Sequence, residues 1–485
     1  MLSKKAIFSR IFQIGEIHRQ SIIFFSGQIT LTIIGFLGTM YFARTLGAAV
    51  LGAYSLFTAY YSIIGMVTDG GFGGAATKKI SEGEEQNAYF SAFFCLRILF
   101  TIIMLILLFL CRKFFVDLNN AGIFAWLLIA LVVSIFSGAF STGIAGLGKM
   151  GIYAVGNNIG EVSRVFFQIL AVFLGYGVAG LTGGFVLGMI VAILFSYRFF
   201  ELKLVRFNWK HIKILSTFSF WLFLTSSGVL MYSYADRVLI GYYLNNTEVG
   251  IYQIAVQLSS LASFATVALR FTLWPKVSRW GKTGDTKLIE KSLSKAIIYS
   301  LVLAVPAMVG GILLGKNLLY FLYAPEFSGG YLALALILVA QVVNVFQTLF
   351  TAYLGALNYQ KEAFNATIVG AVGNVFLNLI LIPIVGVSGA AFATLVTLTF
   401  NAILAWRFLS QKIQIKIESP DLIHIFVASC VMGIAVWAYL RVFTISSTLM
   451  TVVPVFFGVL VYTFLILEID PNLSKDLHEI LIQKK

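Results

Sequence analysis

The chain has 485 residues, of which 59% are hydrophobic and only 11% are charged, and its mean hydropathy is +0.93. A soluble domain averages about 25% charged residues, so this sequence has too few polar groups to cover a folded surface in water. The net charge of +14 does not indicate nucleic-acid binding, because no basic patch interleaved with aromatic residues lies outside the apolar segments.

The apolar segments predict membrane-spanning helices. A spanning helix needs about 20 apolar residues, and barrel strands would alternate apolar and polar residues. The runs Ile98–Leu110 and Leu127–Val133 are instead continuous. We therefore predict an all-α polytopic membrane protein with about 14 transmembrane helices. The expected spans are 21–43, 51–74, 88–110, 121–143, 151–174, 178–200, 215–243, 249–274, 293–315, 330–353, 362–384, 387–409, 421–441 and 449–468.

The segment before the first span, Met1–Gln20, is basic and amphipathic. Because it has no small-residue cleavage site, we do not expect it to be a removed signal peptide. We expect an interfacial helix that leads into the first span.

Lysine and arginine gather in alternate connections along the chain. If the N-terminus is inside, most of them fall in inner segments, as the positive-inside rule requires. This pattern predicts a multi-pass protein of the cytoplasmic (inner) membrane with both termini cytoplasmic. Short hinges such as Gly175–Gly177 and Val385-Gly386 leave no room for an outer domain.

The two halves of the chain contain an internal repeat. Leu51-Gly52-Ala53-Tyr54 reappears as Val249-Gly250-Ile251-Tyr252, and Gly146–Gly180 parallels Ala356–Gly389. Two units of six spans in one orientation imply a parallel duplication with a substrate site near the midplane. We expect a lobe at residues 1–213 with helices 1–6, a lobe at 214–412 with helices 7–12, and two additional helices with a cytoplasmic tail at 413–485.

The same residues resemble the polysaccharide transport family of the multidrug/oligosaccharidyl-lipid/polysaccharide exporter superfamily, which includes O-antigen-type flippases. The resemblance runs over most of the chain and rests on an ordered set of short motifs. They are Ala43–Gly47 with Gly52 and Tyr54, Asp69–Gly73, Asp236–Gly241 with Val249–Tyr252, Trp274–Ser278, Pro306, Tyr323–Phe327, Gly355–Asn358 and Asn374–Gly389. One departure is the outer turn Gly47-Ala48-Ala49, where the family often has Gly-Pro-Glu.

The resemblance implies twelve core helices in two pseudo-symmetric six-helix lobes, followed by two C-terminal helices. It also implies that the protein is a flippase for a polyprenyl-diphosphate-linked oligosaccharide in the lipid bilayer. Coupling to H+ or Na+ is expected, and a polysaccharide polymerase and glycosyltransferases are expected partners. No cofactor and no nucleic acid are expected.

Charged residues within the spans are the first candidates for a site, because each costs at least about 2.5–3.5 kcal/mol at the bilayer centre. Arg97 lies well inside the third span, and Glu161 and Arg164 are three residues apart on one face of the fifth, where they can pair. Arg97 and Arg164 suit a diphosphate through their planar donor fork, and Glu161 is a candidate for ion coupling or gating. The alternative is structural: Glu161 and Arg164 form an ion pair, and Arg97 hydrogen-bonds neighbouring carbonyl groups.

Further candidates lie in the second, seventh and eleventh spans. Asp236 and the substrate-binding candidate Arg237 are adjacent and face different neighbours, so a gating or a structural role is open. Asp69, near an inner helix end, is an ion-coupling candidate or a polar helix end. Asn374 and Asn378 are one turn apart and contact sugar hydroxyls or neighbouring helices. Arg44 and Arg270 are expected to snorkel to the interfaces.

Catalytic and metal sites are not predicted. The three cysteines and four histidines show no metal-ligand spacing and no nucleophile arrangement. A polymerase or glycosyltransferase would need a large outer loop or an acidic catalytic motif, so we expect no enzyme. The alternatives to the oligosaccharide flippase are a peptidoglycan lipid-precursor flippase and a multidrug or organic-cation antiporter of the same fold.

Overall fold

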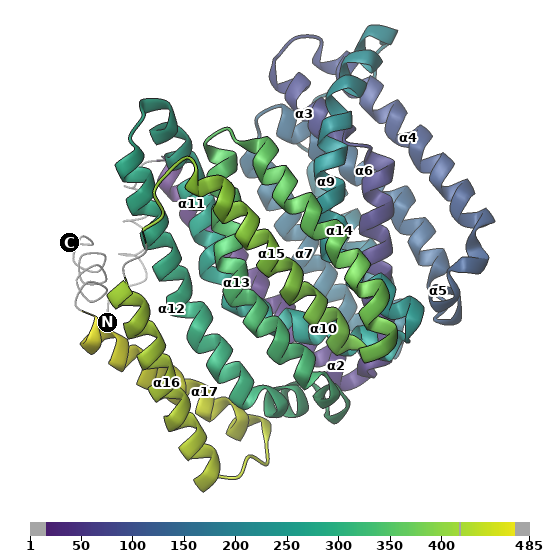
Figure 1. Cartoon of the computed structure of the whole chain (residues 1–485). Coiled ribbons are helices and arrows are strands. Elements are labelled where there is room, and N and C mark those ends of the chain that lie inside the picture. Colours follow the sequence, from purple (N-terminus) through teal and green to yellow (C-terminus); the bar gives the residue numbers. More distant parts are fainter. Residues whose placement is uncertain (1–15, 417–418, 471–485) are drawn as a thin grey trace, which may run out of the picture. The chain divides into compact units, whose positions relative to one another are not determined.

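The computed structural model describes residues 16–416 and 419–470, and helices make up the fold, with no strand in these two ranges (Figure 1). Among these residues, eleven helical stretches are long and apolar enough to cross a membrane. The predicted all-α polytopic membrane fold is thereby confirmed. Of the expected interfacial helix, Met1–Gln20, residues 1–15 lie outside the described residues.

The chain divides into two compact units, Met1–Leu230 and Met231–Lys485. The two additional C-terminal helices belong to the second unit. The boundaries expected from the sequence, after residues 213 and 412, stay predictions.

In the first unit, the helices of the middle part pack most extensively, with α7 against α8 and α6 against α8. Its apolar core includes Phe72, Ile80, Phe90 and Phe93, all buried. The helices of this unit are α2 (Glu16–Asp69), α3 (Phe72–Ser81), α4 (Gln86–Leu110), α5 (Val116–Asn120), α6 (Phe124–Gly146), α7 (Met150–Phe173), α8 (Gly177–Tyr197) and the first part of α9 (Trp209–Tyr243), with a 3-10 turn at Arg112–Phe114.

In the second unit, α13 packs against α15 and α12, and α14 packs against α15. Its core includes Leu293, Ile297, Leu349 and Phe350. The unit consists of the end of α9, α10 (Asn246–Ser259), η2 (Ser260–Ser263), α11 (Phe264–Thr283), α12 (Thr286–Leu318), η3 (Leu319–Tyr323), η4 (Pro325–Gly330), α13 (Tyr331–Ala356), α14 (Gln360–Val385), α15 (Val387–Ser410), α16 (Ser419–Val442) and α17 (Thr448–Ile469).

The number of spans depends on how α2, α7 and α9 are counted. The helix α2 contains two predicted spans, because its backbone leaves the helical conformation at Gly47 (φ 79°, ψ 175°). The helices α7 and α9 occupy the positions of predicted spans but are not among the eleven apolar stretches. The polar residues of α7, which include Asn157, Glu161 and Arg164, lower its hydropathy. The count of fourteen stays a prediction.

The internal repeat is visible in the backbone. Gly148, between α6 and α7, has φ +75°, and its repeat counterpart Asn358, between α13 and α14, has φ +68°. Asparagine is one of the few residues besides glycine that adopts this left-handed conformation readily. This pair of corresponding turns therefore has the same left-handed backbone conformation.

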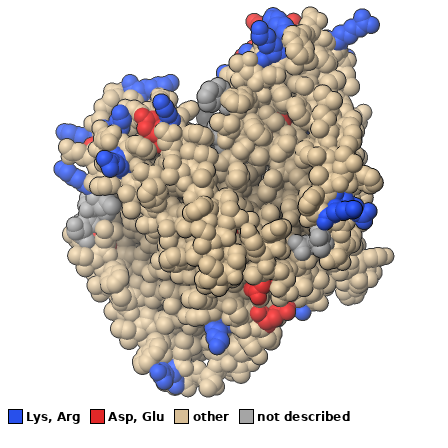
Figure 2. Space-filling model, turned by 45° about the vertical axis from the view of Figure 1, so that its right-hand side comes forward, with Lys and Arg blue, Asp and Glu red and all other residues tan. Residues whose placement is uncertain are grey.

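Charged side chains are unevenly distributed on the face that Figure 2 shows. Lysine and arginine occur on this face in a few separate groups, and most of the surface between these groups is uncharged. Wide uncharged surfaces are expected of helices whose sides face hydrocarbon.

Candidate functional site

The first unit contains a polar cavity of about 360 Å³. One face of α7 supplies Asn157, Glu161 and Arg164, because residues three and four apart share a helix face. The remaining lining residues are Tyr61, Ser137, Gly160, Phe185, Gly188, Met189 and Ala192. A polar lining is unusual in a membrane-embedded unit and marks this cavity as a candidate site.

Arg164 is held in this cavity from two sides. Its Nη2 lies 2.5 Å from Glu161 Oε2, so the ion pair considered from the spacing is present. Its Nη1 donates to the Tyr54 hydroxyl at 3.3 Å, and the buried Gln168 donates to the same hydroxyl at 2.8 Å. The Glu161 side chain is 50% exposed, whereas that of Arg164 is 26% exposed. A fixed guanidinium group thus borders open space.

Arg97 lies outside this cavity and forms a different pair. Its Nη1 donates to Asp69 Oδ1 at 2.6 Å, and its Nη2 donates to the Ser134 carbonyl oxygen at 2.9 Å. Asp69 is the last residue of α2 and also accepts from the Gly73 amide at 3.2 Å. Two residues that the sequence presents as separate candidates are therefore one ion pair.

The second unit contains a buried carboxylate among neutral donors. Asp236, on α9, is 8% exposed and forms no ion pair within the described part of the chain. The Tyr252 hydroxyl donates to its Oδ2 at 2.6 Å, and Thr394 donates to the same oxygen at 3.0 Å. Asn378 donates to Oδ1. Hydrogen bonds rather than a cation therefore surround this charge.

Asn374 and Asn378 extend this group, which we call the Asp236 cluster: Asp236, Tyr252, Asn374, Asn378 and Thr394. Asn378 Nδ2 lies 3.0 Å from Asn374 Oδ1, and both asparagines are almost completely buried. The Asn378 Oδ1 atom is buried without a hydrogen-bond partner among the described residues. The neighbouring Arg237 does not join the cluster; its guanidinium stacks on the Tyr234 ring, 5.1 Å from the ring centroid.

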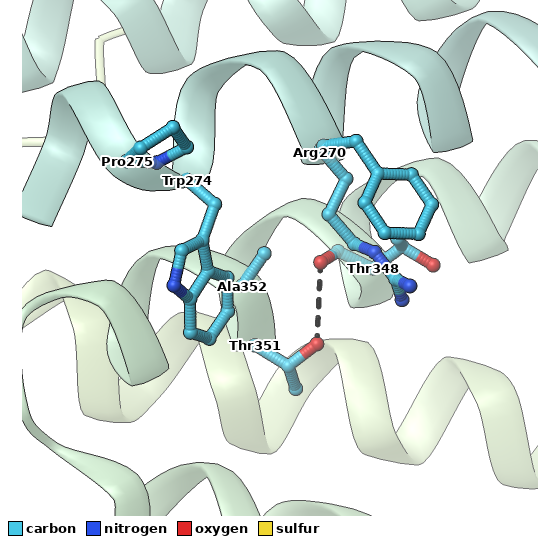
Figure 3. A pocket seen from close by; sticks show the side chains of 7 residues that line it. Arg270, Trp274, Pro275, Thr348, Thr351 and Ala352 are labelled. Atoms are coloured by element: carbon cyan, nitrogen blue, oxygen red, sulfur yellow. Dashed lines mark hydrogen bonds between the residues drawn. The ribbon is translucent and has the colours of Figure 1, made fainter. Parts of the chain in front are cut away.

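A second cavity, of about 500 Å³, lies between α11 and α13 of the second unit (Figure 3). Arg270 and Trp274 extend from α11, and Thr348 and Thr351 come from α13 (Figure 3). The Arg270 guanidinium stacks on Phe271 at 5.0 Å, and it forms no ion pair with any described residue. The cavity thus combines a cation without a paired carboxylate, an indole ring and two hydroxyl groups.

The repeat relates the polar groups of the two units. Tyr54 and Tyr252 occupy the same repeat position, as do Arg164 and Asn374, and Gln168 and Asn378. Each tyrosine hydroxyl contacts polar side chains, but in the first unit these include an arginine and in the second an aspartate. The two equivalent tyrosines therefore contact charged side chains of opposite sign.

Several residues of these sites were not candidates from the sequence. Tyr54 and Tyr252 belong to the repeat motif, and Gln168 lies one turn beyond Arg164 on the same helix. The repeat and the helical spacing could therefore have indicated these three residues. The sequence placed Arg270 only near an interface. Its position in a cavity depends on the packing of α11 against α13, which the sequence does not reveal.

Comparison with known proteins places the chain among glycan-related membrane proteins. A family described as "Polysaccharide biosynthesis protein" matches residues 17–280, more than half of the chain, and the MatE family matches residues 222–380. The probable low-salt glycan biosynthesis flippase of Haloferax volcanii is 27% identical over 94% of this chain and 97% of its own length. A second probable flippase of the same organism is 23% identical over 96% of this chain and 98% of its own length.

The fold has solved counterparts. The lipid II flippase MurJ in an inward closed conformation superposes with a TM-score of 0.78 at 19% identity, covering 93% of this chain and all of the other. An inward-facing multidrug resistance transporter of the MATE family gives a TM-score of 0.64 at 14% identity, covering 79% of this chain and 94% of the transporter. The chain belongs to the polysaccharide biosynthesis protein family, in the polysaccharide transport branch of the multidrug/oligosaccharidyl-lipid/polysaccharide exporter superfamily.

Proposed function

We propose that this protein is a flippase that moves a polyprenyl-diphosphate-linked oligosaccharide, such as an O-antigen, capsule or exopolysaccharide repeat unit, from the inner to the outer leaflet by alternating access. The observation that carries the proposal is that each unit has an arginine on the wall of a cavity, Arg164 in the first and Arg270 in the second. We assign no catalytic step to the protein.

The chemistry of the two cavities suits such a substrate. A diphosphate has several anionic oxygens, and a guanidinium group binds them through two parallel N–H donors. Trp274 offers a flat apolar face beside Arg270, and Thr348 and Thr351 offer hydroxyl groups. Indole rings and hydroxyl groups are suited to sugar rings, which have both apolar faces and polar edges.

The relatives support the same class of substrate. Two of them are named as probable flippases, one of them for glycan biosynthesis, and the match covers nearly the full length of both chains. The peptidoglycan lipid precursor is an alternative substrate with the same diphosphate chemistry. The cavity arginines disfavour the second alternative, an organic-cation antiporter, because a cationic substrate requires acidic groups in excess.

We further propose that transport is coupled to a cation, H+ or Na+, bound at the Asp236 cluster. A buried carboxylate without an ion pair is costly unless a cation or a proton neutralises it. Asp236, Asn378 and Thr394 present oxygen atoms, the ligand type that hard cations prefer. Arg237, which stacks on Tyr234, and the Asp69–Arg97 pair have no part in this proposal.

The remaining elements of the proposal concern the cell. Inner connections rich in lysine and arginine support a cytoplasmic membrane location with both termini inside. In that orientation the flippase receives its substrate from cytoplasmic glycosyltransferases and delivers it to an outer polymerase.

Transport of a lipid-linked oligosaccharide in proteoliposomes tests the substrate assignment. We expect Arg164→Ala and Arg270→Ala each to reduce the initial rate at least about tenfold, because a hydrogen bond to a charged group contributes about 1.5–3 kcal/mol. Arg441→Ala, which removes an exposed arginine stacked on Trp437, serves as the matched control and should transport normally. Undiminished transport by both cavity variants in correctly folded protein would refute the assignment.

Imposed ion gradients test the coupling. We expect a proton or a sodium gradient to accelerate transport by the native protein, and Asp236→Asn to abolish that acceleration while leaving substrate binding intact. Glu248→Gln, in the first turn of α10, is the control. Transport that is insensitive to both gradients, or an Asp236→Asn protein that still responds, would eliminate the coupling site without affecting the substrate assignment.

A further inference from the structure

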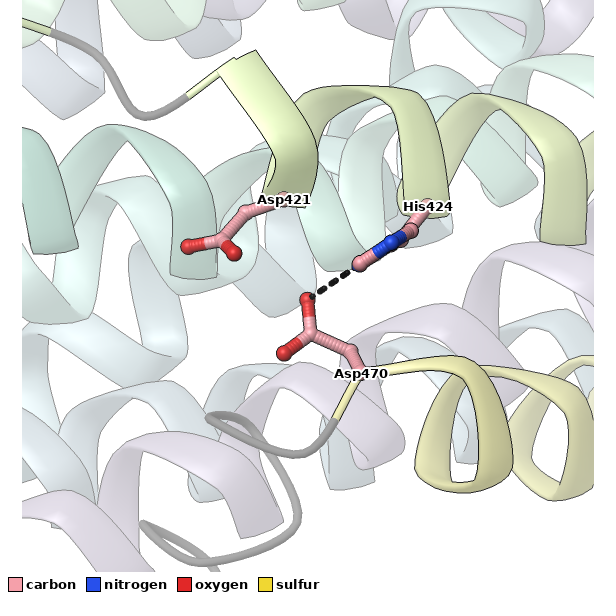
Figure 4. Close-up of side chains that lie close together, drawn as sticks. All are labelled: Asp421, His424 and Asp470. Atoms are coloured by element: carbon pink, nitrogen blue, oxygen red, sulfur yellow. Dashed lines mark hydrogen bonds and ion pairs between the residues drawn. The ribbon is translucent and has the colours of Figure 1, made fainter.

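Three metal-ligating side chains meet where α16 begins and α17 ends: Asp421, His424 and Asp470 (Figure 4). We propose that they bind a divalent transition-metal ion, with Zn²⁺ as the representative probe, and that this ion fastens the start of α16 to the end of α17. The site shares no residue with the cavities or the Asp236 cluster, and the inference goes beyond the proposed transport function.

Local structure brings the three residues together. Asp421 and His424 are three residues apart in the first turns of α16 and therefore lie on one helix face. The helix α17 packs against α16, and Asp470 is the C-cap residue that directly follows α17 (φ −114°, ψ 95°). The hairpin thus returns the third ligand to the level of the first two.

The distances suit ligands of one ion. One ligand atom from each residue lies within 4.8 Å of the other two, and His424 Nδ1 lies 3.3 Å from Asp470 Oδ2. Zinc binds nitrogen and carboxylate oxygen at about 2.0–2.2 Å, which puts two ligands of a tetrahedral ion about 3.3–3.6 Å apart. The histidine and Asp470 already have this separation, and a carboxylate oxygen of Asp421 lies within 4.8 Å of both ligand atoms.

Burial makes a divalent ion a suitable occupant. Asp470 is completely buried and Asp421 is 6% exposed, while the His424 side chain is 29% exposed. Two carboxylates buried beside one another repel. A divalent cation between them supplies two positive charges and leaves the imidazole neutral, as ligation requires.

The composition of the group selects the class of metal. Imidazole nitrogen suits zinc, copper, iron and nickel, whereas magnesium and calcium prefer sites made of oxygen atoms alone. One imidazole and two carboxylates therefore favour a first-row transition metal. The sequence does not indicate this site, because Asp470 is distant from the other two residues in the chain and only the packing of α16 and α17 brings them together.

Direct titration of the full chain tests the proposal. The protein, in detergent, without an affinity tag and treated with a chelator, is titrated with Zn²⁺ against a chromophoric competitor. We expect one equivalent of Zn²⁺ per chain. Asp470→Asn and His424→Ala should each weaken binding at least about tenfold, since even outer-shell changes cost 10–100-fold. Glu468→Gln, an exposed carboxylate two residues from Asp470, and His211→Ala should bind Zn²⁺ like the native protein.

A second measurement needs no variant and therefore does not depend on folding of the mutants. Histidine modification by diethyl pyrocarbonate, located by mass spectrometry, should be slowed at His424 by one equivalent of Zn²⁺ and unchanged at His211. The same amount of Mg²⁺ should give no protection. Absence of stoichiometric binding, unchanged modification of His424, or equal protection by Mg²⁺ would each overturn the proposal.

Discussion

Arg97 and Arg164 are both arginines of the first unit that contact a carboxylate, but their surroundings differ. Arg97 is 8% exposed, and its guanidinium is shared between Asp69 and a backbone carbonyl. Removal of one partner of such a buried pair typically costs 3–5 kcal/mol because it leaves an uncompensated charge. Arg164 instead borders a cavity. We therefore interpret the Asp69–Arg97 pair as structural and Arg164 as a substrate contact.

The space around Arg97 gives a prediction at the residue scale. A Cβ atom at Gly138 would overlap the Arg97 guanidinium. We expect Gly138→Ala to destabilise the protein by about 1–3 kcal/mol, the usual cost of overpacking, and to lower the midpoint of thermal unfolding in detergent.

The matched control is Gly35→Ala in α2, where an added Cβ has no neighbour within 4 Å. This variant should be neutral or slightly more stable, because alanine favours a helix over glycine by about 1 kcal/mol. Equal effects of the two substitutions would contradict the tight packing around Arg97.

The sequence indicated that Arg97 and Asp69 were unusual, since charges are rare within spans. It did not indicate that they form a pair, because that contact depends on where α2 and α4 approach each other. For Glu161 and Arg164 the spacing along one helix was sufficient. Pairs within a helix are thus accessible from the sequence, and pairs between helices are not.

At the scale of elements, equivalent turns in the two units are stabilised by different chemistry. In the first unit the chain turns at Gly47, whose φ of 79° and ψ of 175° are almost restricted to glycine. In the second unit Asn245 has an extended backbone, and its side chain caps α10 by accepting from the Glu248 amide. A backbone conformation in one repeat is replaced by a side-chain cap in the other.

These two turns predict different tolerance to substitution. Gly47→Ala should cost about 1–3 kcal/mol through backbone strain. Asn245→Ala should cost about 1 kcal/mol through loss of the cap, and Asn245→Gly only a few tenths. Thermal unfolding of the three variants measures the effects. If Gly47→Ala lowered the unfolding temperature no more than Asn245→Gly does, the proposed difference between the two turns would be contradicted.

Element boundaries were predictable where turns are sharp and helices are uniformly apolar. The spans expected at 387–409 and 449–468 are found as α15 (Val387–Ser410) and α17 (Thr448–Ile469). The helix α2 differs, because it begins at Glu16, before the first expected span, and continues past residue 43 into the second expected span. The 3-10 turn η2 within the eighth expected span also had no sequence signal, since no proline or glycine marks it.

At the scale of the whole molecule, the distribution of lysine and arginine predicts which connections face the cytoplasm. After the native cysteines Cys95, Cys111 and Cys430 are replaced by serine, single cysteines test this orientation. Lys113→Cys and Lys316→Cys should react with a membrane-impermeant maleimide in intact cells. Arg206→Cys and Lys282→Cys should react only after permeabilisation. The reverse pattern would invert the proposed orientation.

The fold class followed from hydropathy, and the two-unit architecture followed from the repeat, because both depend on patterns that extend over the whole chain. The cavities could not be predicted from the sequence, since a cavity forms where the side chains of neighbouring helices leave space unfilled. The pocket of Arg270 and Trp274, for example, requires the relative position of α11 and α13.

The Asp236 cluster has an electrical consequence. In the proposed coupling, the cluster is neutral with a bound proton or sodium ion, and without that ion Asp236 has a full negative charge on a membrane-embedded helix. One charge that crosses the whole membrane changes in energy by about 2.3 kcal/mol per 100 mV. A voltage that is negative inside therefore acts differently on the loaded and the empty protein, and the turnover of this flippase should vary with membrane potential even when no concentration gradient is present.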